Sequence, residues 1–258
     1  SEYKWEYFSW GNKVLDSLIW FNEEHDLIVL HWKYWCGKTT LWTAMCNFNW
    51  EKWIKSCLMT LEMNSDKLKK AQAVWRCWIS KPDLQAWKFS EEERLKMIQY
   101  YNDYDKNFLL VWDWQSVDIS DLCKSIKELH NQWYKLFVID NLRKINVVGA
   151  KTDNQVDIIK MQALQSLRNE LPICIVLIHH DNKEGSWFSW TQVIWDLADT
   201  IVHVTKELDP DADGKIIFHQ AIIDIYKERL NQVRECIFNF NKWALEYVDS
   251  YIKEWKKK

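Results

Sequence analysis

Glycine and proline are scarce in this sequence, which has 5 Gly and 3 Pro among its 258 residues. Average usage of about 7% would give roughly 18 Gly in a domain of this length. Glycine allows the backbone to adopt positive φ angles and to approach a ligand closely, so this shortage leaves little provision for either. Tryptophan, which cannot take over these roles, is present in excess at 19 residues. The composition is therefore abnormal in its ratio of tryptophan to glycine.

Long apolar runs and a strong charge imbalance are also absent. The longest apolar runs, 27–30, 136–139 and 173–178, have the size of buried strands and fall short of the roughly 18 residues that a membrane-spanning helix needs. A net charge of -3 with 28% charged residues excludes a disordered polyelectrolyte. We therefore expect one globular domain over residues 1–258 that makes no membrane contact.

Cysteine spacing indicates neither a zinc site nor a disulfide framework. The 7 cysteines stand at positions 36, 46, 57, 77, 123, 174 and 236, and none of them forms a pair with zinc-ligand spacing. Their number is odd, which is unusual for a secreted disulfide scaffold. Reduced thiols in a cytoplasmic protein are therefore the favoured interpretation.

Short apolar runs alternate with longer amphipathic stretches, which predicts an α/β domain with a mostly parallel central sheet flanked by helices. The later strands are expected to be partly antiparallel. Expected strands cover residues 26–30, 56–61, 108–111, 136–139, 173–178, 200–205, 215–225 and 235–239. Expected helices cover residues 38–47, 65–77, 91–102, 119–132 and 156–170.

A phosphate-binding motif follows the first expected strand. The segment HWKYWCGKTT, residues 31–40, fits G-x-x-x-x-G-K-[ST] except that Trp32 replaces the first glycine. Backbone N–H groups would surround the phosphates, Lys38 would neutralise the β and γ oxygens, and the Thr39 hydroxyl would bind Mg²⁺. The alternative is an ordinary strand-to-helix turn. The predicted ATP-binding set is Trp32, Lys33, Tyr34, Trp35, Cys36, Gly37, Lys38, Thr39 and Thr40.

Two further strands end in a carboxylate. Asp140 closes the apolar run 136–139, which is where a second Mg²⁺ contact is needed beside the phosphate loop. Glu62 follows the second strand and could orient the water that attacks the γ-phosphate. The alternative for Glu62 is a surface residue that caps the helix beginning near Ser65.

The order of these segments resembles the RecA-like ATPase domain of hexameric replicative DNA helicases of the DnaB and Twinkle type. The resemblance covers about residues 8–249. It implies a RecA-like P-loop fold without a collar or primase-type domain. The matching segments are TLEMNSDKL (60–68), LFVIDNLRKI (136–145), LPICIVLIHHDNK (171–183), WDLADTIVHV (195–204) and KER (227–229).

The resemblance also implies roles for individual residues in ATP hydrolysis. It makes Glu62 the catalytic base, places Asp140 at the metal beside Thr39, and puts a γ-phosphate sensor at His180. Lys227 and Arg229 would reach the nucleotide of a neighbouring subunit, with Arg229 as the arginine finger. The alternative for His180 is a histidine at the end of a strand that binds no ligand. The alternative for Lys227 and Arg229 is a pair of exposed basic residues.

The implied partners are single-stranded DNA and further copies of the chain in a homo-hexamer. Residues 182–191 match the channel loop that holds the DNA backbone, with Lys183, Ser186 and Ser189 as the contact residues. The net charge of -3 lends no support to a basic DNA-binding surface. Two alternatives stay open, namely a RecA- or KaiC-like ATPase of recombination or signalling, and a nucleotide-binding protein without turnover.

Tryptophan stands at several positions where the family motifs have glycine. Trp32 takes the first glycine of the phosphate loop, Trp53 precedes the strand that leads to Glu62, and Trp133 precedes the strand that ends at Asp140. Further such positions are Trp78, Trp87, Trp190 and Trp195.

Independent mutations would not repeatedly replace the smallest residue by the largest. We therefore hypothesise that UGA codons for glycine, as found in some reassigned genetic codes, were read as tryptophan. With a genuine Trp32, we expect weak or absent ATP binding, because an indole sits where the backbone must wrap the phosphates.

Overall fold

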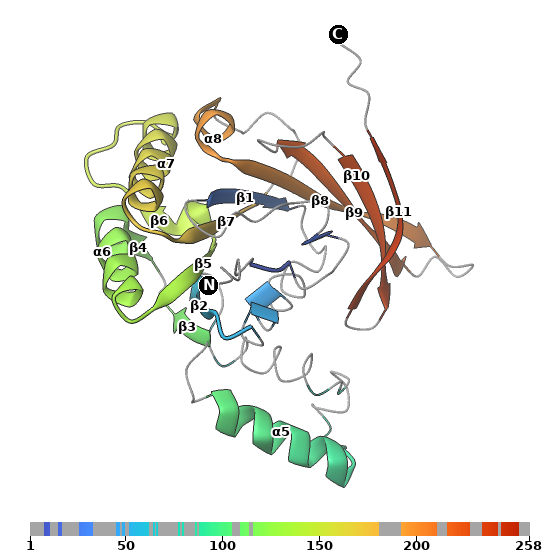
Figure 1. Cartoon of the computed structure of the whole chain (residues 1–258). Helices are drawn as coiled ribbons and strands as arrows, with labels where there is room; N and C mark the ends of the chain where they lie inside the picture. The colour runs from blue at the N-terminus through green and yellow to red at the C-terminus, as the bar shows by residue number, and fades with distance from the viewer. Residues whose placement is uncertain are drawn as a thin grey trace, which may run out of the picture.

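A nine-stranded sheet forms the centre of the molecule in the computed structural model (Figure 1). Its strand order is β11-β10-β9-β8-β1-β7-β5-β2-β3. The structure describes residues 8–10, 15–16, 26–32, 45–46, 48–49, 52–61, 64, 66, 77, 79, 86, 88–104, 109–113, 116–180, 192–210, 216–227, 234–241 and 244–252.

The strands from β8 to β3 in this order run parallel to one another, whereas β8 to β11 are antiparallel. The predicted α/β fold, with a mostly parallel sheet and antiparallel strands near the C-terminus, is therefore confirmed. The strands are β1 (Asp26–Trp32), β2 (Lys55–Thr60), β3 (Leu109–Asp113), β5 (Tyr134–Asp140), β7 (Cys174–His180), β8 (Thr200–Pro210), β9 (Ile216–Lys227), β10 (Arg234–Asn241) and β11 (Ala244–Ile252).

Helices α6 and α7 lie side by side next to the parallel half of the sheet, while α5 lies beyond its β3 edge (Figure 1). A short 3-10 turn, η1, follows β5 and leads into a small parallel pair of β4 with β6. The bounds are α5 (Glu91–Tyr104), α6 (Ile119–His130), α7 (Asp153–Glu170), α8 (Gln192–Leu197), η1 (Leu142–Lys144), β4 (Val117–Asp118) and β6 (Ile145–Asn146).

Both faces of the parallel strands are buried. Along β7, Ile175 and Leu177 pack with apolar residues of α6, α7 and α8, whereas Val176 and Ile178 belong to a second cluster on the other face. Successive side chains of a strand point to opposite faces, so a strand covered on both faces needs a continuous apolar run. This is why the short apolar runs predicted the central strands.

Several boundaries differ from the sequence prediction. Helix α7 begins at Asp153 rather than at position 156, because Thr152 caps it by accepting a hydrogen bond from Gln155 N at 3.3 Å. Helix α6 ends at His130 rather than at position 132, where a turn takes over. Helix α8 and strand β11 were not predicted. The expected helices 38–47 and 65–77 lie largely outside the described residues.

A buried asparagine ties the N-terminal segment to the chain before β2. Asn49 is fully buried, accepts a hydrogen bond from Ser9 N at 2.8 Å, and donates to Ser9 O at 2.8 Å. It also donates to Met45 O at 2.8 Å, within the helical residues that follow the phosphate-loop motif. The polar atoms of this side chain are thus satisfied inside the core.

Burial suppresses the reactivity of four cysteine thiols. Cys46, Cys57, Cys123 and Cys174 form no disulfide. Burial raises the pKa of Cys46 to about 12 and that of Cys123 to about 11. Because the thiolate is the reactive form, these side chains behave at neutral pH as small apolar residues.

Candidate functional site

Four parallel strands bring the predicted site segments to one edge of the sheet. Trp32 at the end of β1 pairs with His180 at the end of β7, and Asp140 at the end of β5 pairs with Ile178 of β7. On the other side of β5, Asp140 pairs with Thr60, the last residue of β2. The carboxyl edge of a parallel sheet is where ligands bind in open α/β folds. The entry to the phosphate loop, Asp140 and His180 therefore converge there.

The chain that leads to Glu62 is attached directly to Asp140. Leu61 N donates a hydrogen bond to Asp140 O at 2.6 Å, and the side chains of Thr60 and Asp140 are each 1% exposed. Asp140 therefore lies deep in this edge, beside the last residue of β2 and not on the outer surface. Carboxylate oxygens are the ligands that Mg²⁺ prefers in proteins.

Lys227 lies away from this edge. Lys227 of β9 pairs with Ile201 of β8, which in turn pairs with Val29 of β1. Trp32, at the carboxyl end of β1, pairs with Val204, which lies three residues further along β8. Three strand residues correspond to roughly 10 Å. Strand β9 is antiparallel to β8, so it runs away from the carboxyl edge and ends at Lys227. The structure therefore does not bring Lys227 to the phosphate-binding edge of its own chain.

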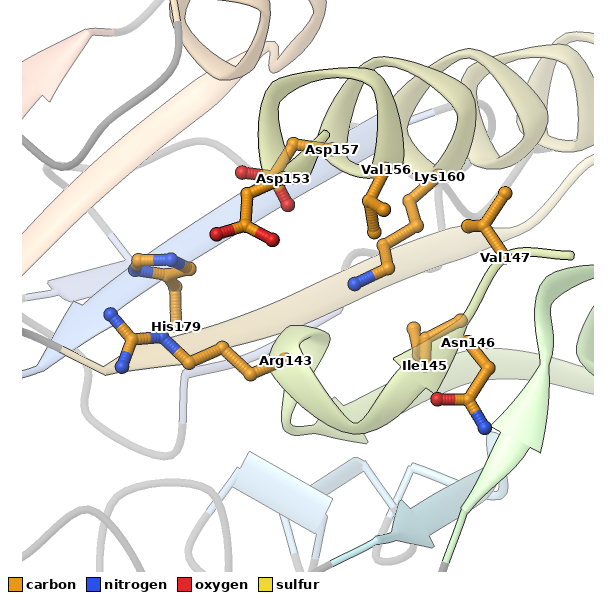
Figure 2. A pocket seen from close by; sticks show the side chains of 9 residues that line it. All are labelled: Arg143, Ile145, Asn146, Val147, Asp153, Val156, Asp157, Lys160 and His179. Atoms are coloured by element: carbon orange, nitrogen blue, oxygen red, sulfur yellow. The ribbon is translucent and has the colours of Figure 1, made fainter. Parts of the chain in front are cut away.

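A cavity of about 690 Å³ lies beside the carboxyl end of β7 (Figure 2). It is bounded by η1, β6 and the first turns of α7, and Figure 2 shows side chains of Arg143, Asp153 and Lys160 directed into the same space. The lining residues are Arg143, Ile145, Asn146, Val147, Asp153, Val156, Asp157, Lys160 and His179.

The charges of this cavity are partly desolvated. Lys160 is 3% exposed and donates to Leu142 O at 3.0 Å. Burial lowers the pKa of Lys160, and the carboxylates of Asp157 and Asp153 oppose that shift. Burial likewise raises the pKa of Asp157, against the effect of Lys160 and Arg143. The cavity thus combines the buried Lys160 and the half-buried Asp157 with the exposed Asp153 and Arg143.

Comparison with known proteins identifies the family. Residues 9–184, well over half of the chain, match the family model described as the DnaB-like helicase C terminal domain. The chain belongs to this helicase family. No curated protein matches it.

Solved structures share the fold of this helicase domain at low sequence identity. A structure described as an ATPase domain has a TM-score of 0.81 and 14% identity, covering 94% of this chain and 91% of that chain. A DnaB-like replicative helicase, described with its interactions with primase, has a TM-score of 0.78 and 14% identity. That match covers 93% of this chain and 63% of the other.

Family and fold together support a helicase or ATPase role with nucleotide binding, and the predicted resemblance is confirmed. In the described part of this helicase domain, none of the helices has the length and apolar character that a membrane crossing needs.

The predicted site residues of this helicase domain are described only in part. The structure describes Asp140 fully, and it describes Trp32, His180 and Lys227 by their backbone positions. The others lie outside the described residues, and these are Lys33, Tyr34, Trp35, Cys36, Gly37, Lys38, Thr39, Thr40, Glu62, Lys183, Ser186, Ser189 and Arg229.

The sequence reasoning missed two groups of this helicase domain. One is the charged cavity, for which the spacing of Asp153, Asp157 and Lys160 on one helical face was the available signal. The other is a row of three buried histidines, His31, His179 and His203, on adjacent strands. The ring centroid of His31 lies 5.3 Å from that of His179 and 4.9 Å from that of His203. No sequence signal marked this row, because it exists only through strand pairing.

Proposed function

We propose that this chain is the ATP-hydrolysing motor of a ring-shaped DNA helicase that moves along single-stranded DNA during replication. The observation that carries the proposal is the convergence of Trp32, Asp140 and His180 at one carboxyl edge, in a chain of the helicase family. Nucleotide chemistry needs a phosphate cradle, a metal-binding acid and a γ-phosphate sensor in one place. Strand pairing brings the segments that would supply them together.

The residues would divide the work as follows. Lys38 would bind the phosphates, and Thr39 with Asp140 would hold Mg²⁺, which neutralises charge on the transferred phosphoryl group. The buried carboxylate of Asp140 fits an oxygen-preferring cation. Glu62, two residues beyond Thr60, would orient the attacking water. His180 would contact the γ-phosphate from the neighbouring strand end.

A neighbouring subunit would complete each site. The position of Lys227, on the amino side of the sheet from Trp32, supports a role outside the site of its own chain. Arg229, two residues after Lys227 in the sequence, would act as the arginine finger for the adjacent nucleotide. We accordingly propose a homo-hexamer with ATP bound between subunits.

Single-stranded DNA would contact the same end of β7. Residues Lys183, Ser186 and Ser189 follow directly after β7, and the cavity with Arg143 and Lys160 adjoins that strand through His179. Arg143, which is exposed at this cavity, would supply a cation for a DNA phosphate that the net charge of -3 does not reveal. A ring concentrates such local charges in its channel.

The decisive experiment is the comparison of Glu62→Gln with the surface control Glu92→Gln of α5. ATP turnover stimulated by single-stranded DNA, together with strand displacement, is measured in the Trp32→Gly chain so that nucleotide binding is not limiting. We expect Glu62→Gln to reduce turnover by about 100-fold or more, since a positioned base contributes at least that much, and Glu92→Gln to leave it unchanged. Equal activity of the two variants would contradict the assignment.

The alternatives have distinct outcomes in the same assay. DNA-stimulated turnover without strand displacement would favour a RecA- or KaiC-like ATPase. Nucleotide binding without any turnover would favour a regulatory nucleotide-binding protein.

A further inference from the structure

Two tryptophans adopt the backbone conformation that favours glycine. Trp53 has φ 64° and Trp133 has φ 72°, in the same left-handed region as Gly149 at 84°. Among the described residues other than glycine, these two alone have positive φ. A bulky residue with positive φ is a genuine outlier, because its Cβ approaches the following carbonyl group too closely.

The indole side chains at both positions are largely exposed. Trp53 is 76% exposed and Trp133 is 77% exposed. Tryptophan is highly buried on average, since its large apolar surface stabilises a fold only when it leaves water. At these two positions the backbone has the left-handed conformation typical of glycine, while most of the indole surface remains in water.

The local hydrogen bonds explain why the left-handed conformation is needed. Ile54 N donates to Asn49 O at 2.9 Å, which spans five residues around Trp53 and has the pattern of a helix C-terminal motif. At the other site, Trp133 N donates to His130 O at 2.8 Å, just after α6 ends. Glycine is the usual left-handed residue at such helix ends. Both residues then lead almost directly into a central strand, β2 or β5.

Position 32 also has tryptophan where glycine is expected, and there the expectation comes from a sequence motif and not from a backbone angle. Trp32 stands where the phosphate-binding motif requires its first glycine, and the whole chain has 19 Trp and 5 Gly. We infer that positions 32, 53 and 133 are glycine in the protein as its source organism makes it, because their codons are UGA and specify glycine there. The part that concerns position 32 rests on the proposed function, whereas positions 53 and 133 rest on the backbone alone.

The direct test is the mass of peptides that span positions 53 and 133 in the protein purified from its source organism, together with the codons. The expected result is glycine at both positions and UGA in the gene. Tryptophan in the peptides, or UGG codons, would overturn the inference. This result does not depend on whether the chain hydrolyses ATP.

A second test uses recombinant protein and separates the backbone from the indole. Trp53→Gly and Trp133→Gly are compared with Trp53→Ala and Trp133→Ala, which remove the indole but retain Cβ. We expect the urea midpoint to rise for the glycine variants and to rise less for the alanine variants. An equal shift for glycine and alanine would overturn the conformational argument. A fall with glycine would overturn it too, and would indicate that the two exposed indoles serve as a contact surface.

The consequence for position 32 is tested by nucleotide binding. We expect Trp32→Gly to bind a fluorescent ATP analogue at least tenfold more tightly than the chain with tryptophan. Unchanged affinity, with glycine found at positions 53 and 133, would contradict the phosphate-loop assignment and leave the inference for the other two positions intact.

Discussion

Arg168 of α7 and Asp199, which immediately precedes β8, form an ion pair with side chains that are 5% and 3% exposed. Asp199 also accepts a hydrogen bond from Leu27 N at 2.8 Å. The pair therefore ties α7 to the start of β1, the strand that leads into the phosphate loop. Charges this deep in a protein are costly to leave without their partner.

We expect Asp199→Ala to lower the free energy of unfolding by about 3 to 5 kcal/mol, since it leaves the Arg168 charge buried. The matched control is Glu170→Ala, which breaks the pair of Lys127 and Glu170, whose side chains are 46% and 54% exposed. An exposed pair contributes only about 0 to 1 kcal/mol. Urea unfolding of the two variants measures the difference. Similar costs for both would show that burial does not govern the Asp199 pair.

At the scale of elements, two neighbouring helices begin with different caps. Asp118 accepts from Ser120 N at 2.9 Å at the start of α6, whereas the uncharged Thr152 caps α7. Hydrogen bonds from the backbone N–H and the hydroxyl of Ser120 lower the pKa of Asp118 below its ordinary value. Only the first of these caps depends on pH.

We expect Asp118→Ala and Thr152→Ala each to lower the free energy of unfolding by about 1 kcal/mol at neutral pH. A carboxyl with a lowered folded pKa stabilises the fold above its unfolded pKa of about 3.9, and this contribution disappears as the pH falls through the folded value. The cost of Asp118→Ala should therefore shrink below about pH 4, while that of Thr152→Ala stays constant. Urea unfolding across pH checks this, and parallel pH profiles would contradict it.

Element prediction from sequence succeeded where burial enforces a pattern. The central strands β1, β5 and β7 were predicted because their apolar runs are buried on both faces. Strand β11 was missed because Glu246 and Asp249 interrupt the apolar residues of ALEYVDSYI, and the strand is stabilised by its pairing with β10. Helix α8 has 6 residues, too few for a helical period to be visible.

At the scale of the whole molecule, the opposite directions of β1 and β9 separate the two predicted halves of the ATP site. Trp32 lies at the carboxyl edge, whereas Lys227, the last residue of β9, lies level with Val29 in the middle of β1. We accordingly expect one chain to provide the phosphate loop for one nucleotide and the basic pair for another. A heterologous interface of this kind forms a ring when its rotation closes.

This arrangement predicts complementation between inactive subunits. We expect Lys38→Ala and Arg229→Ala, each in the Trp32→Gly chain, to lose most ATP turnover on their own. Mixing them should restore part of it, because the intact phosphate loop of an Arg229→Ala subunit meets the intact Arg229 of a Lys38→Ala subunit. Turnover of the mixture at different ratios measures the effect. No recovery, with mixed oligomers demonstrated, would contradict a site shared between subunits.

The sequence alone determined the fold class, the family and the order of the site segments, because apolar periodicity and the phosphate-loop pattern are local properties of the chain. It also identified Trp53 and Trp133 as glycine-like positions. Only the tertiary structure decided which strand ends are neighbours, which placed Asp140 beside Thr60 and His180 beside Trp32. It alone also formed the cavity around Lys160 and gave the two tryptophans a measurable left-handed φ. Strand order, register and burial arise from contacts between residues far apart in the chain, so no local pattern encodes them.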